Sequence, residues 1–532
     1  MSGLATMTSH TTDSTCDKKL EEGVGRTVAV ADSPLGAISE EEDGDDGAKL
    51  AGETAITFTQ EEEQAVRRKV FIRIVPLLAA VYFSQFLDKG SVNYAAVMGL
   101  PLASKGVQWN HAVSAFYYGF LVAEIPQSIL AQRFGMSTWL GINICLWSGA
   151  LWLHSATSLF APFFIFRFIL GACESVVSPV LIASVAAWFK KDEQSRAVAA
   201  FYAQNGISTI VGGALAYGLN TYTGTVDKWR LIYFVLAAMA LVVGVAVLIF
   251  LPNSVSSAKF LTPRERQIAL ERVRGNQSGT VSRKWKKAQA LEAVRDPKVW
   301  LLCGLMFVIS VPNAAITSFT SILIKSFGYT SAEALLYNMP SGAVQLVTTI
   351  TIAFWADRRR VRMLPFIAAV IPSIVGFALL IAYSANSGSA KDNKTPLLVG
   401  VFLSQTFVSA LSLLFSWSAS NIAGSSKRSV VNGALLFSFA GGNICGSQAF
   451  QQSTAPDYIP GKITLFVLLV LLVPFALVLR WYTLRLNRKK AEQVRALVEE
   501  HGWSPEDLQR EKDAMAFKDA TDSENPFYVY VC

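Results

Sequence analysis

The chain has 532 residues, of which 52% are hydrophobic and only 16% are charged, and its formal net charge is +8. Soluble proteins usually carry about a quarter charged residues, so this composition excludes an ordinary soluble globular fold. The six cysteines and four histidines lack disulfide or metal-ligand spacing, and no phosphate-binding loop or catalytic set is recognisable. We therefore expect no metal, no cofactor and no enzymatic activity.

The first 66 residues are polar and include the acidic run EEEDGDD, a composition that predicts a disordered tail. Twelve hydrophobic runs follow, each about 20 residues long and able to cross about 30 Å of hydrocarbon as a helix. They lie near residues 71–98, 112–132, 138–156, 161–188, 196–219, 229–251, 299–321, 333–356, 363–384, 396–420, 430–450 and 463–481. The expected fold class is an all-α membrane protein with twelve transmembrane helices.

A basic segment between the sixth and seventh runs divides the chain into two halves of six helices. In this segment Thr262 predicts an N-cap, Pro263 the first helical position and Glu265 the end of a capping box. Asp296 followed by Pro297 predicts the start of the seventh span. The expected parts are an N-terminal tail (1–66), an N-terminal half (67–252), a central loop (253–296), a C-terminal half (297–482) and a C-terminal tail (483–532).

The distribution of Lys and Arg predicts the orientation of the helices. Basic residues gather before the first span, in the even-numbered connections and after the twelfth span, whereas the odd-numbered connections contain few of them. By the positive-inside rule both termini then face the cytoplasm. The net charge therefore reflects topology, and we expect contact with a lipid bilayer but no nucleic-acid partner. We expect a monomeric, multi-pass protein of the cell membrane.

Related sequences follow the second and eighth spans, SILAQRFGM and AFWADRRRVR, which indicates an internal duplication. Asp357 and Arg358 in the second of these stretches are expected to tie two helix ends together as part of a cytoplasmic gate. Arg133 is the counterpart in the first half, where Gln132 takes the place of the acid, so the tie there is expected to be weaker.

Charged residues interrupt the first and fourth hydrophobic runs. Asp88 and Lys89 lie in the first, and Arg167 and Glu174 lie seven residues apart on one face of the fourth. Charges inside a membrane are costly and usually face a cavity or a partner. Two helical turns separate Arg167 from Glu174 by about 10 Å, so each is expected to find its partner on the first span.

Two interpretations of these four charges remain open, a transport site and a purely structural network. Burial and a nearby cation change the proton affinity of a carboxyl group in opposite directions. If an arriving anion draws the cation away, the acid takes up a proton, and this exchange would couple an anion to a proton.

Further polar residues in the spans have either a binding or a packing role. Glu124 is another intramembrane acid of uncertain role. Asn93 follows Lys89 by one turn, and Gln345 lies in the eighth span; both are candidates for substrate binding. Asn443 in GGNICG is expected to face the cavity because its glycine neighbours allow a close helix approach.

Several motifs together resemble the fungal allantoate permease group of the anion:cation symporter family, within the major facilitator superfamily. These are LDKGSVNYAAVMGL, FRFILGACESVVSP, FLTPRERQIALERVRGNQSG, DPKVWLL and GGNICGSQAF, and the similarity runs from about residue 67 to 490. The resemblance implies two six-helix halves around a central cavity and proton-coupled transport of small organic anions by alternating access.

Carried over by position, the resemblance implies that Lys89 and Arg167 hold a substrate carboxylate and that Asp88 and Glu174 carry protons. Related bacterial members typically have Arg where this chain has Lys89. The predicted function is proton-coupled import of a small carboxylate, ureido acid or vitamin-like acid. Export of an anionic metabolite and a non-transporting nutrient sensor remain the alternatives.

Overall fold

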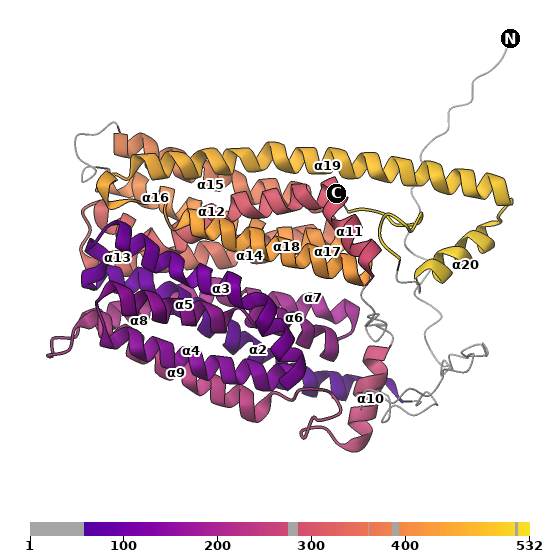
Figure 1. The fold of residues 1–532 in the computed structure, drawn as a ribbon, viewed down its shortest axis with the longest axis horizontal. Helices are drawn as coiled ribbons and strands as arrows, with labels where there is room; N and C mark the ends of the chain where they lie inside the picture. Colours follow the sequence, from indigo (N-terminus) through magenta and orange to yellow (C-terminus); the bar gives the residue numbers. More distant parts are fainter. Residues whose placement is uncertain (1–57, 275–285, 360, 386–392, 517–519, 532) are drawn as a thin grey trace, which may run out of the picture. The chain divides into compact units, whose positions relative to one another are not determined.

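The computed structural model describes residues 58–274, 286–359, 361–385, 393–516 and 520–531. Most of the predicted N-terminal tail therefore lies outside the described residues. Regular secondary structure in the described part of the chain is helical throughout, as the composition predicted (Figure 1).

The N-terminal half contains six spans built from eight helices. These are α2 (Gln60–Val97), α3 (Val107–Phe134), α4 (Met136–Ala156), α5 (Phe160–Glu174), α6 (Val177–Trp188), α7 (Lys191–Tyr202), α8 (Gln204–Asn220) and α9 (Lys228–Phe250). The pairs α5–α6 and α7–α8 each form one predicted span with a short interruption.

The C-terminal half repeats this plan. Its helices are α12 (Pro297–Ser326), α13 (Ser331–Leu336), α14 (Asn338–Arg359), α15 (Met363–Ala385), α16 (Lys394–Ser404), α17 (Phe407–Asn421), α18 (Ser425–Gly446) and α19 (Ile459–His501). Among the described residues, three further α-helices lie outside the spans, α10 (Pro263–Arg274), α11 (Lys287–Arg295) and α20 (Pro505–Ala516), together with two short 3-10 helices, η1 (Pro101–Ser104) and η3 (Gln452–Thr454).

Each of the twelve predicted hydrophobic runs falls on one helix or one interrupted pair, which confirms the fold class. Within the described residues, nine of these spans are long and apolar enough to cross a membrane by length and composition. The other three are α3, α4 and the α7–α8 pair, in which polar residues such as Glu124 and Asn143 lower the hydropathy. Large apolar side chains face outward, among them Ile125 (72% exposed) and Val242 (69% exposed), as expected of a surface in contact with lipid.

The interruptions within spans have local causes. Pro179 has no amide hydrogen, so the carbonyl of Ser175 lacks its helical donor and α5 ends at Glu174. Between α16 and α17 the hydroxyl of Thr406 bonds to the carbonyl of Ala369 on α15. The hydroxyl of Ser373 accepts the amide of Phe407 at 2.8 Å. These side-chain bonds replace the helical ladder at this break.

The two halves meet along equivalent helices. In Figure 1 the indigo to magenta helices of the N-terminal half lie beside the pink to yellow helices of the C-terminal half. Helix α2 contacts α12, α3 contacts α18, and α8 contacts α14. These are spans 1 with 7, 2 with 11, and 5 with 8, so exchanging the two halves gives the same set of contacts. This symmetry agrees with the predicted internal duplication.

The helix ends agree with the sequence at two caps and differ from it at two boundaries. Thr262 and Glu265 form the predicted capping box, and Asp296 caps α12 through the amide of Lys298. Helix α2, however, already begins at Gln60, because Thr59 forms a capping box there. Helix α19 continues without a break to residue 501, so the predicted boundary at residue 482 falls inside a helix.

Candidate functional site

A small polar cavity lies where the two halves meet. Its volume is about 40 Å³, which is room for a few water molecules. It is lined by Phe86, Gly90, Asn93, Tyr94, Asn205, Thr209, Ile316, Thr317, Thr320, Asn338, Gln345 and Gln405. The first six residues come from α2 and α8 of the N-terminal half, and the other six come from the C-terminal half.

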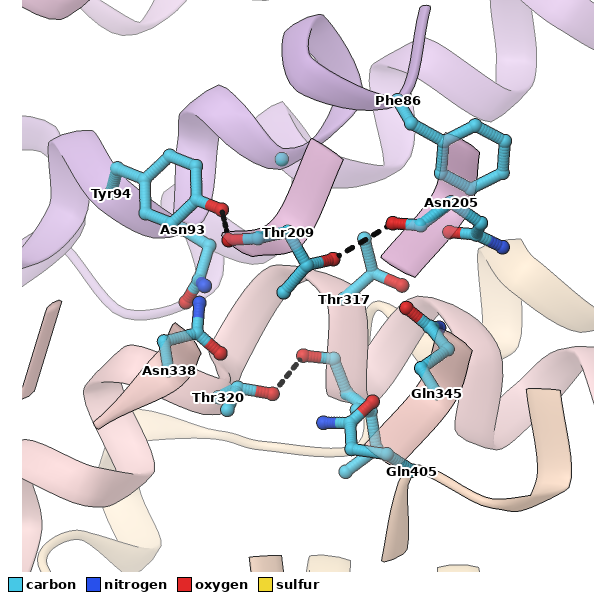
Figure 2. A pocket seen from close by; sticks show the side chains of 12 residues that line it. Phe86, Asn93, Tyr94, Asn205, Thr209, Thr317, Thr320, Asn338, Gln345 and Gln405 are labelled. Atoms are coloured by element: carbon cyan, nitrogen blue, oxygen red, sulfur yellow. Dashed lines mark hydrogen bonds between the residues drawn. The ribbon is translucent and has the colours of Figure 1, made fainter. Parts of the chain in front are cut away.

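Carboxamide groups dominate the polar lining (Figure 2). Asn93 and Asn338 point toward one another from the two halves. The side-chain oxygen of Asn93 accepts the amide of Ser321 at 2.8 Å. The other four carboxamides make no side-chain hydrogen bond to any described residue; they are those of Asn205, Asn338, Gln345 and Gln405. Each of them therefore offers two N–H donors and one carbonyl acceptor to the cavity.

Lys89 lies beside the cavity in a cage of aromatic rings. Its ammonium nitrogen is 5.7 Å from the ring centre of Phe86, 5.2 Å from that of Tyr117 and 5.5 Å from that of Phe439. Phe86 also lines the cavity, and Phe439 belongs to α18 of the opposite half. Rings attract a cation, but none of them neutralises it. In the described structure Lys89 forms no ion pair, although Glu174 interacts with it electrostatically.

The remaining charges of the first and fourth spans lie in the interior of the N-terminal half. Successive helical residues point about 100° apart, so Asp88 faces inward while Lys89 faces the other half. Asp88 is 1% exposed, Arg167 2% and Glu174 fully buried. Arg167 donates to the carbonyl of Lys89 at 3.3 Å, and its guanidinium carbon lies 5.5 Å above the ring of Phe116.

The predicted cluster exists, but it is not a set of ion pairs. Glu174 interacts electrostatically with Lys89, Arg167 and Asp88, yet the four described side chains form no ion pair with one another. Both carboxyl oxygens of Glu174, one of Asp88 and two guanidinium nitrogens of Arg167 have no hydrogen-bond partner. Buried charges without fixed partners are costly, so this arrangement suits groups whose partner or protonation state changes.

A close crossing of two helices positions Arg167 and Glu174. A Cβ atom on Gly171 would lie 1.9 Å from the carbonyl oxygen of Phe116, and one on Gly119 would lie 1.9 Å from that of Phe168. The two glycines therefore let α3 and α5 touch backbone to backbone. Arg167 and Glu174 lie one turn before and just after Gly171, so the crossing fixes their depth in the bundle.

Of three polar residues predicted to bind substrate, two line the cavity and one does not. Asn93 and Gln345 line the cavity, and their role in binding stays a prediction. The expectation that Asn443 faces the cavity is wrong. Its side chain is fully buried, accepts from Asn313 at 2.8 Å and donates to the carbonyl of Phe439. The glycines of GGNICG bring α18 against α12, and Asn443 joins the two helices there.

The predicted gate residues do not pair as expected. Asp357 binds Arg362 at 2.8 Å, while Arg358 lies 5.9 Å from the ring of Phe354. A tie across the turn between α14 and α15 therefore exists, but its cation is Arg362. Among the described residues, Arg133 forms no ion pair. Glu124 is 8% exposed and forms neither an ion pair nor a hydrogen bond there.

Sequence reasoning missed several residues that face the site. Asn338 lies seven residues before Gln345, on the same face of α14, and this spacing was a usable signal. No sequence signal identifies Gln405, Tyr117 or Phe439. Only the packing of separate helices brings Gln405 to the cavity and the other two residues to Lys89.

Two six-helix halves around a polar cavity define a membrane transporter. The model of the Major Facilitator Superfamily matches residues 78–447, and the chain belongs to this superfamily.

Individual relatives agree with this assignment. The chain is 33% identical to the allantoate permease of Saccharomyces cerevisiae, covering 91% of this chain and 90% of that protein. It is 28% identical to the thiamine pathway transporter THI73 of the same yeast, over 91% and 89% of the two chains. The xylose transporter XylE from E. coli, solved in a partially occluded inward open conformation, shares the fold with a TM-score of 0.57. That comparison covers 76% of this chain and 97% of the other at 12% identity. The predicted resemblance to the allantoate permease group is thus confirmed.

Proposed function

We propose that the protein is a secondary active transporter that imports a small organic anion together with protons by alternating access. The observation that carries this proposal is the position of Lys89. Its ammonium group is buried among three rings at the boundary of the two halves without a carboxylate partner. Glu174 compensates this charge only without direct contact, and burying a charge that lacks a direct partner is costly, so an anionic solute that reaches Lys89 supplies that partner.

The same position links binding to movement of the halves. Lys89 belongs to the N-terminal half, and Phe439 of its cage belongs to the C-terminal half. An anion that binds Lys89 competes with this contact between halves. A ligand shifts a conformational equilibrium only if it contacts the two states differently, and this arrangement meets that condition.

Protons are proposed to travel on the two buried carboxyl groups. Glu174 and Asp88 have oxygens without hydrogen-bond partners, and both interact electrostatically with Arg167. When a bound anion engages Lys89 or Arg167, the carboxyl groups lose part of their compensation, and protonation replaces it. Release of the anion reverses the exchange.

The lining of the cavity favours an anion that also carries amide or ureido groups. Four unpaired carboxamides offer donors and acceptors together, which matches the alternating N–H and C=O groups of a ureido acid. The relation to an allantoate permease points to the same class. A cavity of about 40 Å³ holds only water-sized groups, so the bound state requires the halves to move apart.

For orientation we propose that both termini, α10 and α11 face the cytoplasm and that the protein acts in the cell membrane as a monomer. Basic residues gather before the first span, in the even-numbered connections and after the twelfth span, and the positive-inside rule places such segments in the cytoplasm.

The test is uptake of a panel of radiolabelled organic anions, including ureido acids, at acidic and at neutral external pH. We expect one solute of the panel to accumulate, and to do so faster at acidic pH. Lys89→Gln should abolish its uptake. Lys105→Gln is the matched control, because Lys105 is an exposed lysine in the loop after α2. Its replacement should leave uptake of the solute unchanged.

Glu174→Gln separates binding from proton coupling. Exchange of internal for external solute needs no proton release, so this variant should keep exchange but lose accumulation. If Lys89→Gln transports like wild type, the proposed site is wrong. If preloaded cells lose the solute faster than control cells do, the protein exports an anionic metabolite instead.

A further inference from the structure

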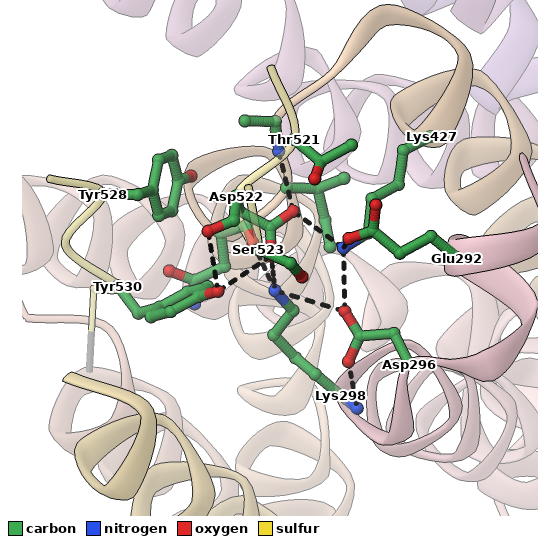
Figure 3. A network of polar contacts seen from close by, with 12 residues as sticks. Glu292, Asp296, Lys298, Lys427, Thr521, Asp522, Ser523, Tyr528 and Tyr530 are labelled. Carbon is green, nitrogen blue, oxygen red and sulfur yellow. Dashed lines mark hydrogen bonds and ion pairs between the residues drawn. The ribbon is translucent and has the colours of Figure 1, made fainter. Parts of the chain in front are cut away.

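Residues 520–531 form an ordered segment that packs against the ends of α12, α17 and α18 and against the side of α19. Figure 3 shows the polar contacts of Asp522 with Lys298 and Lys427. The segment is not helical, yet Thr521 and Asp522 are completely buried and Tyr530 is 4% exposed. Such burial is unusual for a surface connection, and it indicates a specific docking site.

Asp522 lies at the centre of this docking site. Its carboxylate forms ion pairs with Lys298 at the start of α12 and with Lys427 at the start of α18, the latter at 2.9 Å. It also accepts the amide of Ala423 at 3.2 Å and the hydroxyl of Tyr530 at 3.0 Å. Asp522 therefore joins two spans that are far apart in the sequence.

The segment balances the charge of its site. Three lysines converge there, Lys298, Lys427 and Lys490, and the first two are completely buried. Asp296 and Glu292 supply two carboxylates, and Asp522 supplies the third. Without the segment, three cations would face two acids, so docking of Asp522 brings the charges of the site into balance.

Backbone bonds fix the rest of the segment. Asn421, the last residue of α17, exchanges two hydrogen bonds with the backbone of Val531, at 2.9 and 2.7 Å. Trp417 donates to the same carbonyl at 3.0 Å. Tyr528 donates to the carbonyl of Ser420 at 2.9 Å. Three residues in the last turns of α17 are therefore held by the segment.

Helix α17 connects this docking site to the central cavity. It begins at Phe407, two residues after the cavity residue Gln405, and its 15 residues span about 22 Å. The break before it depends on side-chain bonds of Ser373 and Thr406. A helix that is interrupted at one end and held at the other can swing only when the held end is released.

We propose that residues 520–531 act as an intramolecular clasp that holds α17 and keeps the central cavity closed until the segment is released. The segment contacts α17 together with α12, α18 and α19, so it ties these four helices to one another on the proposed cytoplasmic side. Release frees the far end of α17 to swing about the break, and this movement opens a path to Gln405, which lies at the break. The proposal concerns opening of the cavity and does not depend on which solute is transported.

The charge state of Asp522 fits a clasp that is closed at cytoplasmic pH. Burial alone would raise the pKa of Asp522, but the charges of Lys298 and Lys427 outweigh it and hold the pKa below its usual value. The carboxylate therefore stays ionised at cytoplasmic pH, and release requires a competing contact.

The experiment measures how fast a thiol reagent reaches the cavity. Gln405→Cys is introduced into the full-length chain with its six native cysteines replaced, and the detergent-purified protein is labelled without any solute. With the clasp intact, labelling should be slow, because the cavity is small. In Asp522→Asn we expect labelling about tenfold faster or more, since breaking a buried ion pair is strongly destabilising for the docked state.

Glu524→Gln is the matched control. Glu524 is an exposed acid two residues away that accepts only the amide of Thr521, and its replacement should leave labelling slow. Equal labelling in the two variants, or slower labelling in Asp522→Asn, would overturn the proposal.

A second design covers the case in which Asp522→Asn does not fold. A protease site inserted between α20 and residue 520 is cut after purification, and high salt removes the segment. Labelling should then become fast, and a synthetic peptide of residues 520–531 should make it slow again. A peptide with Asp522→Asn should fail to do so. If cleavage and salt leave labelling slow, or if both peptides act alike, the segment is not a clasp.

Discussion

The crossing of α3 and α5 allows a sharp test of the geometry that positions the buried charges. A methyl group at residue 171 would lie 1.9 Å from the carbonyl oxygen of Phe116, on the backbone of the other helix. Ordinary contact needs about 3.5 Å, so the two helices must separate by roughly 1.5 Å. Gly171→Ala should therefore destabilise the N-terminal half strongly.

The expected size follows from the packing. Overpacked sites usually cost about 1–3 kcal/mol, and this contact belongs at the upper end because a backbone atom cannot rotate away. In a half of this size, about 3 kcal/mol corresponds to a fall in melting temperature of roughly 6–12 °C. The assay is the melting temperature of detergent-purified protein, measured by the loss of the monodisperse peak in gel filtration.

Gly149→Ala is the matched control. Nothing lies within 4 Å of a Cβ atom at this helical position, so the substitution should raise stability by about 1 kcal/mol through helix propensity alone. Gly119→Ala meets the same crossing from the other side, and combining it with Gly171→Ala should cost less than the sum, because one separation relieves both clashes. A melting temperature of Gly171→Ala equal to that of Gly149→Ala would refute the crossing.

Three further predictions test other parts of the structure. Asn443→Ala should lower the free energy of unfolding by about 0.6–1.7 kcal/mol, the range for hydrogen bonds between membrane helices, because Asn313 loses its partner. The KM for the solute, measured by uptake, should not change. Arg362→Ala breaks an ion pair whose acid is half exposed, so the melting temperature should shift by less than the equivalent of about 1 kcal/mol, and Arg358→Ala should shift it by nothing measurable. The pKa of Asp522 is lowered in the folded state, so the ionised carboxylate stabilises the fold at neutral and mildly acidic pH, and this effect disappears as pH falls below about 4. Melting temperatures of wild type and Asp522→Asn should therefore differ at neutral pH and converge only in acid.

The sequence predicted those features that depend on local periodicity. Runs of apolar residues identified twelve spans, and the spacing of Arg167 and Glu174 placed both on one inward face. Capping signals at Thr262 and Asp296 identified two helix starts. Each of these depends on residues within a few turns of one another, so one chain is enough to reveal them.

Features that depend on contacts between distant segments escaped prediction. Asn443 has the same sequence context whether it faces a cavity or the neighbouring helix, and only the close approach of α12 decides the outcome. The partner of Asp357 lies five residues away across a turn whose shape the sequence does not specify. Docking of Asp522 depends on Lys298 and Lys427, and the latter is about a hundred residues away in the chain.

The two halves contribute different chemistry to the site, and this division has a consequence. All four buried charges of the predicted cluster lie on α2 and α5 of the N-terminal half, whereas the C-terminal half lines the cavity with neutral groups only. Under the proposed mechanism, charge recognition and proton uptake belong to the first half, and the choice among anions belongs to the second. Replacing Gln345 or Gln405 should change which anion is taken up but preserve the pH dependence of uptake. Glu174→Gln should preserve the choice of anion but remove the pH dependence. Uptake of the same panel by these three variants decides whether the two functions are separable, and a Gln345→Ala variant that loses its pH dependence would show that they are not.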